Sequence, residues 1–293
     1  MVSPPARQAA VRYLQQEKGY SQRRACALVG VPRSMLYYQP QRKPDEAVLR
    51  ERIQRLARQH RRYGYRRITV LLRREGWVVN RKRVHRIWKA EGLSLPLKRR
   101  RRRREGQSLP VPEAAYPGHV WSYDILEDRT EGGGKLRFLN ILDEYSRECL
   151  AIRVEKSITA ERVIETLVPL FRERGAPTYL RSDNGPEFVA QAVREWLSNV
   201  NCQTWFIEPG SPWQNPYLES FNGKFRDECL NGELFRNGQE AGQISEAWRQ
   251  EYNEYRPHSA LDYLTPREYA QQWQEQQEKT QLTMLMNPST LTS

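Results

Sequence analysis

Apolar residues recur along the first hundred positions at the three- and four-residue spacing of amphipathic helices. Segment 45–60 carries its apolar residues at this spacing, and its acidic residues come first. Gly76 and Gly92 end the next two segments of this kind, and Asn80 precedes the second of them as a predicted N-cap. Short helices joined by glycine turns are therefore predicted for residues 1–96.

This helical part divides into two predicted units. Residues 1–42 contain two short helices, with Ser21 as an N-cap and Gly30 as a terminator, a pattern that helix-turn-helix fragments share with many small bundles. Residues 43–96 form a second helix-turn-helix unit, whose last helix turns apolar residues inward. We predict DNA contacts from the outer face of that helix. Its basic residues are Arg81, Lys82, Arg83, Arg86 and Lys89.

A basic and proline-rich linker is predicted for residues 97–115. It opens with seven consecutive basic residues, which repel one another and favour an extended chain. We expect this run to follow the backbone of DNA, with an affinity that falls as salt rises. The run consists of Lys98, Arg99, Arg100, Arg101, Arg102, Arg103 and Arg104.

The apolar spacing changes to the period of two that is typical of strands from His119 onward. Strands are predicted in 119–128, 135–146, 147–157, 177–185 and 202–210, and helices in 159–175, in 186–200 and from Asn215. This order predicts an α/β core at residues 116–272, a mixed five-stranded sheet with flanking helices. The Gln-rich tail, 273–293, is predicted to be helical and then disordered, and we assign it no function.

Charge separates the two halves of the chain. Residues 1–110 hold 30 Lys and Arg against 7 Asp and Glu, a balance of +23, whereas residues 111–293 hold 18 against 28, a balance of −10. A basic half beside an acidic half indicates a module that binds polyanions, joined to a domain that has a different function. A basic membrane-surface segment is the weaker alternative, because the short helices lack a large apolar face.

No apolar run is long enough to cross a bilayer and no signal segment is present, so we expect a cytoplasmic protein. The four Cys and four His are scattered, which predicts reduced thiols and no zinc site.

Three acidic residues are predicted to converge at one rim of the core. Asp124 lies in the first predicted strand, Asp183 at the end of the fourth, and Glu219 at the start of the last core helix. Taken alone, Glu219 could be a solvated residue of a first helical turn. Like charges held together are costly unless cations neutralise them, and carboxylates favour Mg²⁺ or Mn²⁺. Two such ions about 4 Å apart suit an in-line phosphoryl displacement.

Several motifs resemble those of one family. "WSYDI", "SDNGPEF", "SPWQNPYLESFNGKFRDECLN" and "YNEYRPHSALDYLTP" occur in this order, and 35 residues separate Asp183 from Glu219. "YGYRRI" and "VNRKRVHRIW" lie in the basic unit. With these motifs the chain resembles the OrfB-type transposases of bacterial insertion sequences, of the insertion-sequence three family within the retroviral-integrase superfamily. The resemblance covers nearly the whole chain and implies a ribonuclease-H-like core of the DDE type.

The resemblance implies roles for individual residues. It assigns catalysis and the two metal ions to Asp124, Asp183 and Glu219. It also implies DNA contacts from residues on and before the last core helix, and a loop under the second aspartate shaped by Asn184 and Gly185. The implied DNA-contacting residues are Trp213, Asn215, Asn222, Lys224 and Arg226, with Gln214 beside them. For Trp213 a packing role is an equal alternative. We treat the nearby acids Asp128 and Asp143 as solvated or structural, and His258 as a packing residue.

The resemblance also implies an activity. The protein would bind the terminal inverted repeats of its element, cut one strand to free a 3′-hydroxyl, and join that hydroxyl to another phosphodiester. It would follow a copy-out, paste-in route as a dimer or larger synaptic complex, with an upstream helix-turn-helix protein of the OrfA type as a possible fusion or binding partner. Two alternatives stay open at this point: a non-catalytic DNA-binding regulator, and a ribonuclease-H-like nuclease that hydrolyses without joining.

Overall fold

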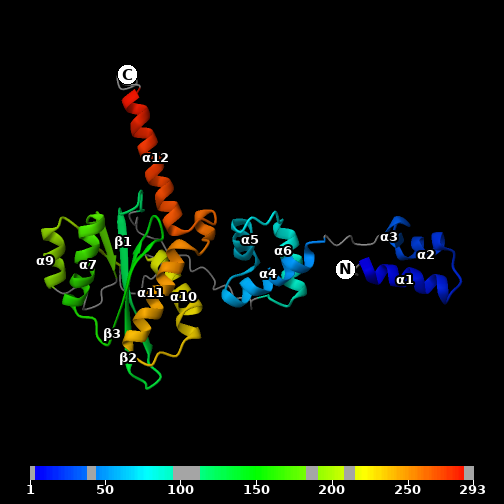
Figure 1. The fold of residues 1–293 in the computed structure, drawn as a ribbon, viewed down its shortest axis with the longest axis horizontal. Helices are drawn as coiled ribbons and strands as arrows, with labels where there is room; N and C mark the ends of the chain where they lie inside the picture. The colour runs from blue at the N-terminus through cyan, green and yellow to red at the C-terminus, as the bar shows by residue number, and fades with distance from the viewer. Residues whose placement is uncertain (1–3, 38–43, 95–112, 183–190, 208–214, 287–293) are drawn as a thin grey trace. The chain divides into compact units, whose positions relative to one another are not determined.

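The computed structural model shows a chain of helices followed by a mixed α/β core (Figure 1). It describes residues 4–37, 44–94, 113–182, 191–207 and 215–286. Two compact units are present, residues 1–52 and 53–293. The first six helices are α1 (Pro4–Gln16), α2 (Gln22–Val29), α3 (Ser34–Tyr37), α4 (Glu46–Gln59), α5 (Tyr65–Arg74) and α6 (Arg81–Ala90).

In the first unit, α1, α2 and α3 enclose a small core. The Ser21 side chain caps α2 by accepting a hydrogen bond from the backbone nitrogen of Arg24 at 3.4 Å. Gly30 ends α2 with φ at 68°, a left-handed conformation that glycine adopts without steric cost. Both ends of α2 are the predicted ones. The buried core residues are Val11, Ala25, Cys26 and Val31.

In the second unit, α5 and α6 pack against each other around a glycine turn. Gly76 has φ at 86°, and the Asn80 side chain then caps α6 by accepting a hydrogen bond from the backbone nitrogen of Lys82 at 2.8 Å. The predicted cap and the predicted inward face of α6 are confirmed. The buried side chains are Ile68, Leu71 and Leu72 of α5 with Val84, Ile87 and Trp88 of α6.

The core holds one sheet in the order β3-β2-β1-β4-β5. Its strands are β1 (Val120–Arg129), β2 (Lys135–Asp143), β3 (Cys149–Glu155), β4 (Tyr179–Ser182) and β5 (Gln203–Phe206). The first three strands pair antiparallel, while β4 pairs parallel with β1 and β5 pairs parallel with β4. This mixed five-stranded sheet confirms the predicted fold class.

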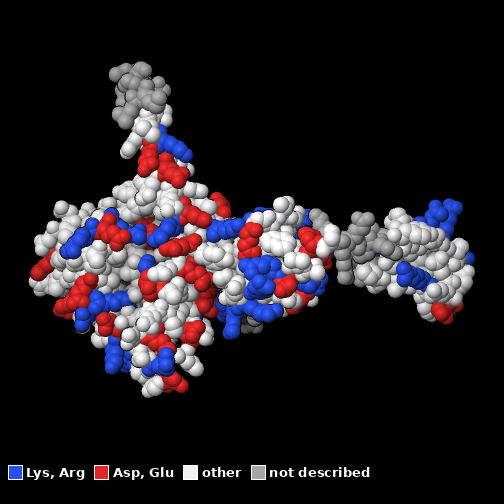
Figure 2. Space-filling model, in the orientation of Figure 1, with Lys and Arg blue, Asp and Glu red and all other residues white. Residues whose placement is uncertain are grey.

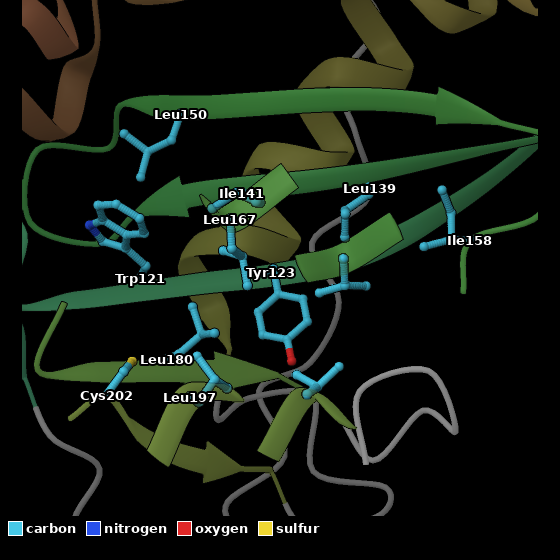
Figure 3. Packing of buried hydrophobic residues seen from close by; sticks show 12 residues of the cluster. Trp121, Tyr123, Leu139, Ile141, Leu150, Ile158, Leu167, Leu180, Leu197 and Cys202 are labelled. Carbon is cyan, nitrogen blue, oxygen red and sulfur yellow. The ribbon is translucent and has the colours of Figure 1, made fainter. Parts of the chain in front are cut away.

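Helices cover both faces of the sheet. They are α7 (Ala160–Arg174), α9 (Gln191–Asn199), α10 (Pro216–Glu228), α11 (Gly238–Glu254) and α12 (Pro266–Met286), with 3₁₀ turns at Leu230–Gly232 and Ser259–Leu261. On one face, Trp121 and Tyr123 of β1 pack with Leu167 of α7 and Leu197 of α9 (Figure 3). On the other face, Phe138 of β2 packs against α10 and α11. Because side chains alternate along a strand, Asp124 lies on the α10 face.

Aromatic contacts hold the start of α12 on the core. Tyr269 packs against Tyr145 with tilted rings at 5.5 Å between ring centroids, and Trp273 stacks on Tyr116 at 6.2 Å. The described side chains beyond Trp273 are exposed. Within the described ranges, every helix is too short or too polar to span a bilayer.

Candidate active site and DNA-binding surfaces

Hydrogen bonds from the sheet and from α10 orient the Asp124 carboxylate. Its Oδ1 atom accepts from the backbone nitrogen of Ile125 at 2.8 Å, and its Oδ2 atom accepts from Nδ2 of Asn222 at 2.8 Å. The residue lies mid-strand in β1 opposite Asn140 of β2, and its side chain is half-buried. The carboxylate is therefore positioned by the sheet on one side and by α10 on the other.

Asn222 joins three elements through one side chain. Its Oδ1 atom accepts a hydrogen bond from Nδ2 of Asn140 at 2.8 Å while its own Nδ2 atom donates to Asp124. Asn140 is 0% exposed and Asn222 is 7% exposed. Buried amides of this kind rarely lack partners, so the pair fixes how α10 lies across β1 and β2. A DNA contact is predicted for Asn222 from the sequence, whereas its bridge between Asp124 and Asn140 is not.

Glu219 lies in the first turn of α10. Pro216 opens the helix, and the backbone nitrogen of Glu219 donates to the Asn215 carbonyl at 3.1 Å. Asn215 occupies the N-cap position, but its side chain makes no capping hydrogen bond. Glu219 is exposed and precedes Asn222 by three residues, so both lie on one helix face about 4.5 Å apart along the axis. The face that contacts Asp124 therefore also carries Glu219.

The third predicted acid, Asp183, lies outside the described residues. β4 pairs with β1 from Val120 opposite Tyr179 to Ser122 opposite Arg181, and it ends at Ser182, the residue before Asp183. Other predicted site residues also fall outside the described ranges. They are Asn184, Gly185, Trp213, Gln214 and the basic run Lys98 to Arg104.

Two basic residues further along α10 make contacts within the protein. Arg226 donates from Nη2 to the Glu127 carbonyl at 2.7 Å and lies 3.6 Å from the Asp128 carboxylate. Lys224 is half-buried and donates to the Ser220 hydroxyl at 2.7 Å. Burial lowers the pKa of Lys224 to about 8. The contacts of both residues with DNA stay predictions.

A buried ion pair lies at the end of α10. Nε of Arg256 donates to Oε2 of Glu228 at 2.6 Å, and the two side chains are 1% and 9% exposed. His258 is buried nearby, and burial lowers its pKa well below its ordinary value. Its ring packs edge-on against Tyr252 at 4.6 Å, in agreement with the packing role expected from the sequence.

The outer face of α6 is basic. Arg81, Lys82, Arg86 and Lys89 are exposed, and Arg83 is half-buried. Lys and Arg side chains gather over the helical part that contains α4 to α6, whereas both signs of charge mix over the sheet domain (Figure 2). Such a face can contact phosphates, and base edges where its helix enters a groove.

The polar turn between β2 and β3 was not predicted from the sequence. Residues 143–148, "DEYSRE", contain four nearly inaccessible polar residues. They are Asp143 at 3%, Glu144 at 1%, Ser146 at 1% and Glu148 at 5% exposure. The sequence does carry one sign of this turn. Two apolar strands need only a short turn between them, yet six polar or aromatic residues, four of them charged, join these two. Asp143 is structural, as expected, but the turn around it was not recognised.

Family models match both the helical part and the core of the chain. The Integrase core domain family matches residues 114–212 and 200–266, and the HTH-like domain family matches residues 43–103. Among solved structures, the catalytic core domain of BIV integrase aligns with a TM-score of 0.44 at 18% identity, over 55% of this chain and 99% of that chain.

Insertion-element proteins are similar over most of their length. The insertion element IS407 uncharacterized 31.7 kDa protein of Burkholderia multivorans is 41% identical over 260 residues, covering 88% of this chain and 93% of the relative. The insertion element IS476 uncharacterized 39.2 kDa protein of Xanthomonas euvesicatoria is 35% identical over 276 residues, with 94% and 80% coverage. The transposase for insertion sequence element IS904 of Lactococcus lactis is 28% identical over 239 residues, with 77% and 94% coverage. On this evidence the chain belongs to the OrfB-type transposases of bacterial insertion sequences.

Proposed function

We propose that this protein cuts one strand at each end of its insertion element and joins the freed 3′-hydroxyl to another phosphodiester. The observation that carries the proposal is the Asn222 bridge, because it ties Asp124 to the helix face that bears Glu219. Asp183 is proposed as the third acid. It follows β4, and β4 is the parallel neighbour of β1.

The proposed acids suit divalent cations. Asp124 and Glu219 supply carboxylate oxygens, the hard ligands that Mg²⁺ and Mn²⁺ prefer. The hydrogen bond from Asn222 to Asp124 is the kind of outer contact that orients a metal ligand. Within the described residues no three His, Cys, Asp or Glu side chains form a metal cluster. The proposed site is completed by Asp183, which lies outside those residues. When bound, two ions would stabilise the attacking and leaving oxygens of an in-line displacement.

The protein's own residues hold the DNA and the acids in place. We assign binding of the terminal repeats to the exposed basic residues of α6 and to the basic linker. Arg226 lies seven residues after Glu219, two turns along the same face of α10, where it could bind a phosphate near the acids. Asn222 keeps the Asp124 carboxylate turned toward α10.

The mode of assembly is part of the proposal. Transposition joins two ends of one element, so the reaction favours a dimer or larger complex that holds both ends. An upstream helix-turn-helix protein of the OrfA type is proposed as a fusion or binding partner. We also propose the domain division at residues 42, 96, 115 and 272 and a copy-out, paste-in route.

An end-joining assay tests the proposed activity. Labelled DNA that carries the flanking repeats of the element is incubated with the protein, Mg²⁺ and a target plasmid, with and without the upstream protein of the same element. We expect a nicked end with a free 3′-hydroxyl, followed by a joined product. Cleavage with no joined product, both with and without the upstream protein, would support a nuclease instead. DNA binding with neither cleavage nor joining, again under both conditions, would support a regulator.

A further inference from the structure

We propose that residues 143–148, the organising turn between β2 and β3, position two of the proposed catalytic acids from inside the core. In this arrangement Glu144 sets the strand that leads to Asp183, and Arg147 sets the first turn of the helix that carries Glu219. The inference rests on the proposed function, because it assigns these residues a role through the acids. Both are positioning residues and touch neither substrate nor metal.

Hydrogen bonds inside the protein hold the shape of the organising turn. Asp143 Oδ1 accepts from the backbone nitrogen of Ser146 at 2.7 Å and from its hydroxyl at 2.8 Å. Asp143 Oδ2 accepts from the backbone nitrogen of Gly118 at 2.6 Å, which ties the turn to the segment before β1. Burial raises the pKa of Asp143. Arg147 follows with φ at 64°, a left-handed conformation that is costly for a residue with a side chain. Such a backbone persists only where its surroundings hold it, and these bonds supply the restraint.

Glu144 reaches from the turn to β4. Its Oε1 and Oε2 atoms accept from Nη1 of Arg181 at 3.0 and 2.9 Å, and the two side chains are 0% and 2% exposed. The Glu144 backbone nitrogen also donates to the Val120 carbonyl at 3.0 Å, at the start of β1. A buried charge is costly without its partner, so this pair holds the end of β4 in one place relative to β1. Arg181 is the second residue before Asp183.

Arg147 reaches from the turn to α10. Its guanidinium carbon lies 3.4 Å from the centroid of the Tyr217 ring, and both side chains are half-buried. Within the described part of the chain, the buried Nη1 atom of Arg147 has no hydrogen-bond acceptor. The guanidinium of Arg147 therefore lies against the face of the aromatic ring in a cation–π contact. Tyr217 is the second residue of α10 and precedes Glu219 by two positions.

The two contacts have one consequence in common. A single buried turn contacts both strand β4 and helix α10, each at a point two residues ahead of a proposed acid. Because β1 and β2 are paired along their whole length, the turn also keeps a constant relation to Asp124. The turn thus sets the distance between strand β4 and helix α10, which belong to different kinds of secondary structure and share no ladder of backbone hydrogen bonds. Loss of its contacts should loosen the acids before it unfolds the core.

Hydrogen exchange of the metal-free, full-length protein tests the inference without relying on catalysis. We expect Arg147→Met and Tyr217→Leu to speed exchange in residues 216–224 and to leave β2 and α7 unchanged. Tyr217→Phe keeps the ring face and should exchange like wild type. Arg172→Met, on the exposed side of α7, is the matched control for loss of an arginine and should also leave residues 216–224 unchanged. The Arg147→Met, Tyr217→Leu double variant should exchange little faster than either single variant, because both changes remove the same contact.

The Glu144 contact has its own readout. Glu144→Gln keeps the size of the side chain and removes its charge from beside Arg181. We expect faster exchange in residues 179–182, with residues 216–224 close to wild type. Faster exchange of equal size throughout the core would contradict a specific role for Glu144.

End joining supplies the second readout. In Arg147→Met the Mg²⁺ concentration for half-maximal joining should rise by up to about tenfold. This is the lower end of the loss expected for a direct outer contact of a metal ligand, because Arg147 acts on Glu219 only through Tyr217. Unchanged exchange in residues 216–224 in both Arg147→Met and Tyr217→Leu would overturn the inference, even with normal joining by wild type. Absence of joining by wild type, with the local change in exchange intact, would instead contradict the proposed function.

Discussion

Replacing Lys224 by Met should stabilise the protein at neutral pH. The side chain is half-buried on α10, and its amine donates a hydrogen bond to Ser220. Burial lowers its pKa from the ordinary 10.5 to about 8, and the nearby Arg256 cation adds to this effect. Folding therefore brings a charge into a place that disfavours it, and a methionine of similar shape removes that cost.

The magnitude follows from the two pKa values of Lys224. A pKa change of one corresponds to about 1.36 kcal/mol, so the fall from 10.5 to about 8 corresponds to about 3 kcal/mol. Partial exposure of the side chain reduces this to about 1–3 kcal/mol. Because the folded-state pKa lies below the unfolded one, the cost is complete below pH 8 and disappears above pH 10.5. At pH 10 it should be roughly a quarter of its value at pH 7.

Urea unfolding from pH 7 to pH 10, followed by tryptophan fluorescence, measures the effect. The difference in unfolding free energy between Lys224→Met and wild type isolates this one titration from all others. Lys224→Arg should gain nothing, because an arginine stays charged throughout this range. Lys279→Met, at an exposed position of α12, serves as the control for loss of a lysine. A Lys224→Met protein no more stable than wild type at pH 7, or a gain that does not shrink toward pH 10, would refute the reasoning.

Three further changes have defined outcomes. Asn222→Ala leaves the buried Asn140 amide without its acceptor and should cost about 1–3 kcal/mol in urea unfolding while slowing end cleavage; full cleavage activity would contradict the bridge. Glu228→Gln leaves the buried Arg256 cation unpaired and should cost about 3–5 kcal/mol, but the Glu228→Leu, Arg256→Met double variant should cost less; an equal or larger loss in the double variant would count against the ion pair. Arg81→Ala should lower the slope of log affinity against log salt by about 0.9 in fluorescence-anisotropy titrations; an unchanged slope would remove Arg81 from the phosphate contacts.

Features set by neighbours in the chain could be predicted from the sequence. Ser21 and Asn80 cap their helices because a short polar side chain can reach amides two or three residues ahead. Pro216 opens α10 because its missing amide proton has no partner in a first turn anyway. The mixed sheet followed from the order of strands and helices, since parallel neighbours need a crossover and antiparallel ones need only a turn.

Features that depend on contacts between distant positions could not be predicted. Asn222 and Asp124 are 98 residues apart, and no local pattern marks their hydrogen bond. Arg147 stacks on a tyrosine 70 positions later, and its left-handed backbone leaves no sign in the residue type, because glycine and asparagine are the usual choices there. The charge of Lys224 is visible in the sequence and its burial is not, so the lowered pKa could not be predicted.

The most direct test of the account is end joining by Glu219→Gln. This change keeps the size of the side chain and removes its charge, and Glu278→Gln on the exposed side of α12 provides the matched control. With Mg²⁺ and repeat-bearing DNA, we expect wild type and Glu278→Gln to join ends, and Glu219→Gln to bind the same DNA with normal affinity and join none. Joining by Glu219→Gln at the wild-type rate would contradict the central claim that the start of α10 carries a catalytic carboxylate.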